Sequence, residues 1–193
     1  MPPEVSVRDE LPGDAAEIGE VVAAAFSSSP FGHHGEAQMV ERLRRACPEA
    51  LSLVANLADR LVGHVLFSPV VIHAAESLHG MGLAPMSVSP AFQRRGVGTL
   101  LIRRGIEILS ERACSFVCVL GYPTYYGRFG FESAARFGLD SEFGGASDGT
   151  FQILWLRDDV TKEQAGGILR YRPEFSSLDH TFPLPPGALH NNP

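Results

Sequence analysis

The stretch Val88-Ser89-Pro90-Ala91-Phe92-Gln93-Arg94-Arg95-Gly96-Val97-Gly98-Thr99 joins an expected strand, residues 82–88, to an expected helix, residues 97–112. Its two glycines permit the backbone to approach a ligand closely. The start of a helix offers free N–H groups and a partial positive charge, so an anion is favoured there. Arg94 and Arg95 add full charges with planar donor forks that suit phosphate. The stretch therefore predicts a phosphate-binding loop, with a glycine-containing turn before a solvated, arginine-rich helix as the alternative.

Positive charge is concentrated in the same region of the chain. Residues 93–112 hold five arginines against two glutamates, whereas the whole chain of 193 residues has a formal net charge of −6. An acidic chain is not expected to be a general nucleic-acid binder, because phosphate backbones need a basic surface. Lys162 is the only lysine among 16 basic residues. This excludes a Walker-type nucleotide loop, since that loop needs a lysine.

The remaining composition bounds the class of protein. A hydrophobic fraction of 45% and a charged fraction of 20% are ordinary for one globular domain. The three cysteines form no C-x-x-C pair and the seven histidines no H-x-x-x-H pair, so no metal site is expected. Neither an apolar signal region nor a run of about 18 apolar residues occurs. We therefore expect no membrane partner and a cytoplasmic location.

Helices and strands alternate along the chain, which predicts an α/β fold. Apolar residues recur at helical spacing in the segments 14–26, 36–47 and 97–112. Strands are expected at 5–8, 51–55, 60–67, 82–88, 116–120 and 151–156, and the last of these is the last clear strand. Pro85 interrupts the strand at 82–88 and predicts a bulge or an irregular edge there.

The C-terminal tail differs from the rest of the chain in composition. Five of the 14 prolines lie beyond residue 170, and proline removes a backbone donor that regular structure needs. We expect one domain over residues 1–160, followed by a C-terminal extension over residues 161–193. This extension is expected to lie on the domain in an extended form or to be partly disordered.

Two motifs together resemble those of the GCN5-related N-acetyltransferase (GNAT) superfamily. The string Gln93-Arg94-Arg95-Gly96-Val97-Gly98 matches that family's coenzyme A motif, Gln/Arg-x-x-Gly-x-Gly/Ala, and residues 83–90 resemble its central strand with a Val-x-Pro exit. The block Tyr125-Tyr126-Gly127-Arg128-Phe129-Gly130-Phe131 is similar to its aromatic-Tyr-x-x-x-Gly-Phe segment and is closest to the YhbS-like branch. The resemblance covers residues 5–160. It implies a single GNAT-type α/β domain, in which helices flank a central mixed β-sheet with a splayed parallel strand pair.

The resemblance also implies the cofactor and how it is held. Acetyl-CoA, the acetyl donor, would lie in a gap between the strands 82–88 and 116–120, with its pantetheine arm paired to the first strand. The N–H of Val88 would polarise the thioester carbonyl, and the pyrophosphate would sit on the N–H groups of residues 94–99. The implied cofactor-binding residues are Met86, Ser87, Val88, Gln93, Arg94, Arg95, Gly96, Val97, Gly98 and Thr99.

One tyrosine is implied as a catalytic residue. Tyr126 matches the family tyrosine that lies near the sulfur and protonates the departing thiolate, a role that a phenol can fill because it keeps its proton at neutral pH. Tyr125 is the competitor for this role, and simple aromatic packing of both rings is the third possibility. Many members carry an asparagine shortly before this tyrosine, whereas this chain reads Leu120-Gly121-Tyr122-Pro123. A contact to the pantetheine or to the sulfur is therefore missing or replaced here.

The residue that would deprotonate the incoming amine is not identified by the sequence. Glu36, at the start of the second expected helix, is the first candidate for a base or substrate residue, and a helix-stabilising acid is the alternative. His33 and His34 are weaker candidates that fit equally well as exposed loop residues. His64 is expected to be a core or edge histidine. Cys118 raises the idea of an acyl-cysteine, but no base is paired with it, so a small buried residue is preferred.

The function expected from these residues is acetyl transfer to an amine. The resemblance implies an acetyl-CoA-dependent N-acetyltransferase in which the amine attacks directly within a ternary complex, without a metal. The acceptor would be a small-molecule amine or a peptide amine, and O-acetylation stays open. The alternative is a non-catalytic acyl-CoA-binding sensor or assembly module of the same fold. A monomer or a homodimer is expected, and a nucleoside-triphosphate enzyme is disfavoured by the scarcity of lysine.

Overall fold

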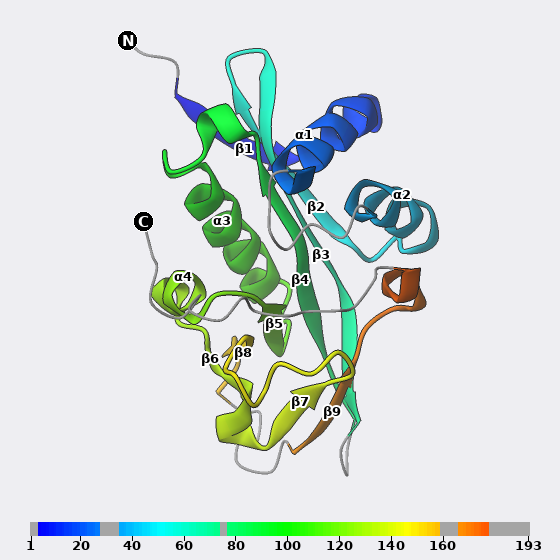
Figure 1. The fold of residues 1–193 in the computed structure, drawn as a ribbon, viewed down its shortest axis with the longest axis vertical. Coiled ribbons are helices and arrows are strands. Elements are labelled where there is room, and N and C mark those ends of the chain that lie inside the picture. Colours follow the sequence, from blue (N-terminus) through cyan, green and yellow to red (C-terminus); the bar gives the residue numbers. More distant parts are fainter. Residues whose placement is uncertain (1–3, 28–34, 74–76, 159–165, 178–193) are drawn as a thin grey trace.

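The computed structural model describes residues 4–27, 35–73, 77–158 and 166–177, and Figure 1 shows how they are arranged. The helices are α1 (Ala15–Ser27), α2 (Glu36–Ala46), α3 (Val97–Glu111) and α4 (Pro123–Tyr126). The strands are β1 (Val5–Asp9), β2 (Leu51–Leu57), β3 (Arg60–His73), β4 (Leu78–Val88), β5 (Phe116–Leu120), β6 (Glu132–Ser133), β7 (Leu139–Ser141), β8 (Phe151–Trp155) and β9 (Gly167–Arg170). Short 3-10 helices are η1 (Pro12–Asp14), η2 (Pro90–Phe92), η3 (Gly127–Phe129), η4 (Ala134–Phe137) and η6 (Pro173–Ser177).

The strands form one mixed sheet, as the resemblance implied. Its order is β1-β2-β3-β4-β5-β8-β6, and β9 pairs with both β3 and β7. Neighbouring strands are antiparallel except for the pairs β4–β5 and β7–β9, which are parallel. The long helix α3 joins β4 to β5, which is the crossover that a parallel pair requires.

Helices cover both faces of the sheet, because successive strand side chains point to opposite faces. Leu53 of β2 and Val65 of β3 belong to the core cluster that includes Leu101 of α3. Their chain neighbours Val54 and Leu66 belong instead to the cluster that includes α1 and α2. Figure 1 shows α3 on one side of the sheet and α1 with α2 on the other. We call these the α3 face and the α1/α2 face.

A glycine brings α3 close to the sheet. A Cβ atom on Gly105 would lie 2.3 Å from the ring of Phe67, so only glycine allows the approach seen here. A Cβ atom on Gly63 of β3 would likewise lie 2.9 Å from Val97 at the start of the helix. The start of α3 is thus held directly against the sheet next to the end of β4.

The strands β4 and β5 separate after two residue pairs. They pair only at Met81↔Val117 and Gly82↔Cys118, although β4 continues to Val88. We call the Gly82↔Cys118 pair the apex of the splay. The pairing of β3 with β4 shifts register between Val65 and Phe67, opposite the segment that contains Pro85. The irregularity predicted from Pro85 is therefore confirmed. After Gly82, the edge of β4 on the β5 side is not paired with any strand of the described residues.

The strands differ from expectation in length and number. The expected strand at 60–67 runs on to His73, and the expected strand at 82–88 begins at Leu78. The ladder continues through Ser68 and Pro69, with Pro69 opposite Met81. The short strands β6 and β7 were not predicted, because two or three residues show no periodicity.

The segment after residue 166 contributes to the sheet and to the core. β9 pairs with β3 at Val71↔Arg170, Ile72↔Leu169 and His73↔Ile168, and Phe175 of η6 is 3% exposed. The expectation that residues 151–156 form the last strand was therefore wrong. Residues 167–170 form part of the sheet of the domain, although they were assigned to an extension lying on it. The division of the chain at residue 160 stays a prediction. Among the described residues, no helix is long and apolar enough to cross a membrane.

Candidate active site

The loop between β4 and α3 is exposed and conformationally special. Gly96 has a φ of +86° and Arg94 a φ of +58°, both in the left-handed region that glycine adopts readily. No side chain of the described residues caps the N-terminus of α3, so the first N–H groups of the helix keep their hydrogen-bonding capacity. Arg94 and Arg95 are exposed, and neither forms an ion pair within the described part of the chain. The loop thus presents backbone donors and two uncompensated positive charges to solvent.

The unpaired edge of β4 presents backbone groups of Met86 and Val88. The N–H of Ser89 donates to the carbonyl of Val62 at 2.9 Å, so the backbone of Ser89 points toward β3. Backbone groups alternate along an antiparallel strand, so those of Val88 and Met86 point away from β3, toward the splay. The side-chain amide of Gln93 donates to the carbonyl of Val88 at 3.1 Å, which agrees with this direction.

Two of the expected cofactor residues serve the protein's own structure as well. Gln93 ties the loop to the end of β4 through its bond to Val88. Ser87 is buried, and its hydroxyl donates to the carbonyl of His64 at 3.4 Å, on the β3 side. The side chain of Ser87 therefore does not face the splay, whereas its neighbours Met86 and Val88 turn their backbone groups there.

Arg60 lies beside the same loop and was missed by the sequence analysis. Its guanidinium lies 5.6 Å from the ring centroid of Phe92, and that of Arg95 lies 5.8 Å from the same centroid. Figure 1 shows the β2–β3 hairpin, at whose tip Arg60 begins β3, rising beside the segment that leads into α3. Nothing in the local sequence relates Arg60 to a loop more than thirty residues away, because only the hairpin brings them together.

Tyr126 is buried on the α3 face at the end of β5. It is 8% exposed and packs with Phe131 and with the α3 residues in one cluster. Gly121 makes room for its ring, since a Cβ atom at Gly121 would lie 2.3 Å from it. Burial raises the pKa of Tyr126 well above the ordinary value, with a smaller contribution from Tyr125. This phenol is therefore protonated throughout the neutral range.

Tyr125 lies closer than Tyr126 to the start of α3. A Cβ atom on Gly98 would lie 2.7 Å from the Tyr125 hydroxyl, so this hydroxyl lies against the first turn of α3. The guanidinium of Arg128 lies 4.5 Å from the centroid of the Tyr125 ring. Burial raises the pKa of Tyr125, while Arg128 and Thr99 oppose that rise. The structure thus brings both tyrosines to the α3 face, with Tyr125 engaged by the helix start.

Glu36 begins α2 and is 5% exposed. Its Oε2 accepts a hydrogen bond from the N–H of Gly35 at 3.2 Å. This contact fits the interpretation as an acid at a helix N-terminus. The two weaker candidates, His33 and His34, lie outside the described residues.

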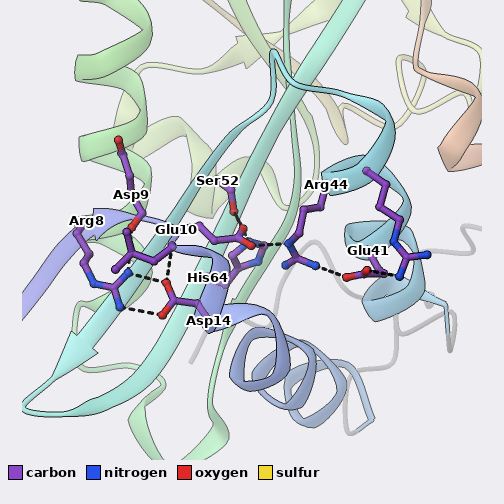
Figure 2. A network of polar contacts seen from close by, with 10 residues as sticks. Arg8, Asp9, Glu10, Asp14, Glu41, Arg44, Ser52 and His64 are labelled. Carbon is purple, nitrogen blue, oxygen red and sulfur yellow. Dashed lines mark hydrogen bonds and ion pairs between the residues drawn. The ribbon is translucent and has the colours of Figure 1, made fainter.

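His64 is a core histidine at the end of a polar chain, as Figure 2 shows. Its Nε2 lies 2.9 Å from the hydroxyl of Ser52, which donates to Glu10, and Glu10 pairs with Arg44 of α2. The Nδ1 atom of His64 has no partner within the described part of the chain. Burial, helped by Arg44, lowers the pKa of His64 to about 3. The ring is therefore neutral at physiological pH and anchors α2 to the sheet.

Cys118 fits the description of a small buried residue. It has no exposed surface, and burial raises the pKa of its thiol to about 12. A thiol with so high a pKa carries almost no thiolate at neutral pH, and the thiolate is the nucleophilic form. This argues against the acyl-cysteine alternative. Among the described residues, no group of three or more His, Cys, Asp and Glu side chains gathers in a way that could hold a metal ion.

Comparisons with known proteins agree with this geometry. The sequence model of the acetyltransferase (GNAT) domain matches residues 12–134. The uncharacterized N-acetyltransferase YhbS of Escherichia coli K12 is 33% identical over 171 residues, which cover 88% of this chain and 98% of that protein. YjhQ from the same strain, also an uncharacterized N-acetyltransferase, is 42% identical over 125 residues, or 63% of this chain and 66% of that protein.

Two solved structures resemble the fold over most of its length. The crystal structure of E. coli YhbS in complex with CoA superposes with a TM-score of 0.79 at 32% identity, covering 90% of this chain and 93% of that one. A GNAT family acetyltransferase from Brucella melitensis in complex with acetyl-CoA gives a TM-score of 0.73 at 34% identity, covering 89% of this chain and 98% of that one. Both neighbours therefore share the overall fold, and each was solved with CoA or its acetyl ester bound.

Proposed function

Because the chain belongs to the acetyltransferase (GNAT) family, we propose that it is an N-acetyltransferase that moves the acetyl group of acetyl-CoA to an amine. The observation that carries the proposal is the unpaired edge of β4, which leads into an uncapped, arginine-flanked helix start. A CoA molecule has the matching parts, an amide-bearing arm and a pyrophosphate. The CoA and acetyl-CoA complexes of the two neighbours support the same reading.

The loop and the helix start fit the phosphate end of this substrate. We assign the pyrophosphate to the N–H groups of residues 94–99, where the helix dipole favours an anion. Arg94 and Arg95 add charge, and Arg60 joins them from the β2–β3 hairpin. The local positive charge is therefore larger than the loop sequence alone indicated.

The edge of β4 fits the pantetheine arm. The backbone groups of Met86 and Val88 face the splay, so the arm can add to β4 as an extra strand would. We assign one N–H of this pair, Val88 by the family resemblance, to the thioester carbonyl. A backbone donor that stabilises the developing negative charge on that oxygen is worth about 3 kcal/mol in comparable sites.

Tyr126 is proposed as the general acid. The amine nitrogen attacks the thioester carbonyl carbon and the carbon–sulfur bond breaks. The leaving sulfur takes the Tyr126 hydroxyl proton, the nitrogen gives one proton to a base, and the Tyr126 phenolate regains a proton from water before the next turnover. The raised pKa of Tyr126 keeps the phenol protonated at neutral pH, so a proton donor is present there. Tyr125 is the weaker candidate, because its hydroxyl lies against Gly98 at the start of α3. Glu36 remains a prediction for the group that deprotonates the amine, as do a cytoplasmic location and a monomeric or homodimeric state.

The proposal is tested by following CoA thiol release from acetyl-CoA with a panel of amines, in the wild type and in Tyr126→Phe. Loss of a general acid should lower kcat by about a hundredfold or more. The affinity for acetyl-CoA should change less than about twofold, because the ring that packs with Phe131 is kept. Tyr122→Phe removes a phenol hydroxyl from an exposed residue of the same segment and serves as the matched control.

The outcomes separate the enzyme from the alternative. Tight binding of acetyl-CoA without transfer to any amine would indicate the acyl-CoA-binding sensor or assembly module instead. Unchanged kcat in Tyr126→Phe, under conditions where the chemical step limits turnover, would refute the role assigned to Tyr126.

A further inference from the structure

Tyr171 lies across the sheet at the apex of the splay. It follows β9, and its N–H donates to Glu142 Oε1 at 2.6 Å. Its ring lies over Gly82 of β4, where a Cβ atom would be 2.9 Å from Cε1 of the ring. Its hydroxyl lies 3.7 Å from the sulfur of Cys118 on β5. One side chain thus reaches from the β3 edge to β5 at the last residue pair before β4 and β5 separate.

This hydroxyl is on the face opposite the proposed acetyl donor machinery. Val117 and Val119 of β5 pack in the α3 cluster with Tyr126. Cys118 lies between them in the chain, so its side chain points to the other face. Tyr171 packs in the two clusters that hold Cys118 and the α1/α2 residues. If acetyl-CoA occupies the gap from the α3 side, an acceptor has to approach the apex from the side of Tyr171.

Two further rings border Tyr171. The ring centroid of Phe143 lies 5.3 Å from that of Tyr171, and the centroid of Phe175 lies 5.2 Å away. We call these three residues the aromatic cluster. Phe143 and Tyr171 are partly exposed, while Phe175 is buried. The cluster therefore offers ring surface on this face of the sheet, and the Tyr171 hydroxyl lies beneath it, beside Cys118 at the apex.

The charged groups around the aromatic cluster are compensated within the described residues. Glu142 accepts from the N–H of Tyr171 and pairs with Arg170 at 3.1 Å. Arg172 pairs with Glu174 at 3.0 Å. An acceptor that carries a phosphate or a carboxylate would thus find no uncompensated cation among these contacts.

We infer that the aromatic cluster recognises the acetyl acceptor, that the Tyr171 hydroxyl positions it, and that the acceptor is an amine with an aryl or extended apolar body. Aromatic faces bind apolar groups and attract ammonium ions. Within the described residues the Tyr171 hydroxyl has a thiol as its partner, which is a weak one, so it keeps its capacity for a stronger hydrogen bond. This inference rests on the proposed function and adds the acceptor class to it.

Steady-state kinetics with four amines test the inference. Phenethylamine and hexylamine represent the aryl and apolar class, while glucosamine and phosphoethanolamine represent polar and anionic amines. In the wild type we expect kcat/KM for phenethylamine to exceed that for the two polar amines by about tenfold or more. Tyr171→Phe should raise the KM of phenethylamine about tenfold through loss of one hydrogen bond, with kcat and the KM of acetyl-CoA within about twofold.

Further variants separate recognition from folding. Tyr171→Leu removes the ring and should reduce the preference for phenethylamine over glucosamine and phosphoethanolamine. Phe143→Leu removes a ring of the cluster away from the apex and should weaken the same preference. This variant keeps the test available if position 171 does not tolerate change. Tyr122→Phe is the matched control, expected to keep all acceptor constants. The thermal midpoint and the acetyl-CoA affinity report whether each variant is folded.

The results that overturn the inference differ from those that overturn the proposed function. Acceptor KM values that are unchanged in Tyr171→Phe, Tyr171→Leu and Phe143→Leu would refute recognition by the cluster while leaving the enzyme activity intact. A wild type that prefers glucosamine or phosphoethanolamine would refute the acceptor class. A wild type that binds acetyl-CoA but acetylates no amine refutes the proposed function, and this inference with it.

Discussion

His64 couples the stability of the fold to pH. Burial holds its pKa at about 3 in the folded protein, against an ordinary value of 6.5. Between these values the unfolded chain binds a proton at this imidazole and the folded chain does not. The unfolded state therefore gains as the pH falls, and the folded state is most stable above the ordinary pKa.

We expect His64 to lower the free energy of unfolding by about 1.4 kcal/mol for each pH unit below about 6.5. His64→Gln should flatten this slope, because an amide does not titrate. Urea unfolding at about pH 7, 6 and 5 measures how the free energy of unfolding depends on pH. The pKa of Asp14, lowered by Arg8 from an ordinary value of 3.8, affects stability only at lower pH. His79→Gln, at an exposed position of β4, is the control, and equal slopes in wild type and His64→Gln would contradict the argument.

At the scale of elements, α3 depends on a glycine on its buried face. A Cβ atom on Gly105 would collide with Phe67, whereas a Cβ atom on Gly19 of α1 would meet nothing within 4 Å. Both residues lie inside helices, where alanine is otherwise preferred. The two positions therefore form a matched pair in which only the packing differs.

Gly105→Ala should destabilise the protein by about 1–3 kcal/mol, since a core without space has to shift to accept the methyl group. Gly19→Ala should stabilise it by about 0.5–1 kcal/mol through helix propensity. Urea unfolding of both variants at neutral pH measures the change in the free energy of unfolding, which should be a loss for Gly105→Ala and a gain for Gly19→Ala. A neutral or stabilising Gly105→Ala would show that α3 sits farther from Phe67 than the structure places it.

Sequence patterns predicted the elements that have a strong period or a motif. The helix 97–112 and the strand 116–120 correspond closely to α3 and β5, because each has a clear apolar pattern. β9 was missed, because only Leu169 of its four residues is fully buried and no alternation develops over so short a strand. The strand extension from Ser68 to His73 was missed because a proline usually ends a strand.

The residues of the candidate site also differ in whether a local sequence pattern could indicate them. The residues of the phosphate loop and Tyr126 could be selected because they are local motifs, and their roles remain predictions. Arg60 and Tyr171 could not be selected, because each is brought to the site by pairing between distant segments, the β2–β3 hairpin and β9 against β3. Single-sequence reasoning does not supply such pairings, since they depend on the register of the whole sheet.

At the scale of the whole molecule, the segment after residue 166 decides whether the predicted boundary at residue 160 is a folding boundary. A chain that ends after Asp158 would lose the buried side chains of Leu169 and Phe175. Each is worth about 2 kcal/mol, and a domain has only about 5–15 kcal/mol in total. We expect a lower urea midpoint for this chain than for one ending after Ser177, which keeps β9 and η6. Equal midpoints would support the boundary at 160.

Gly82 has no side chain, so another segment of the chain covers the sheet at this position. The strand supplies no side chain of its own at the apex, and the surface there is the Tyr171 ring, which comes from a segment almost ninety residues later in the sequence. Tyr171 and residues 86–99 therefore come from separate segments of the chain. Descendants of one ancestor could keep residues 86–99 unchanged and acquire new chemical selectivity by exchanging the ring that rests on this glycine.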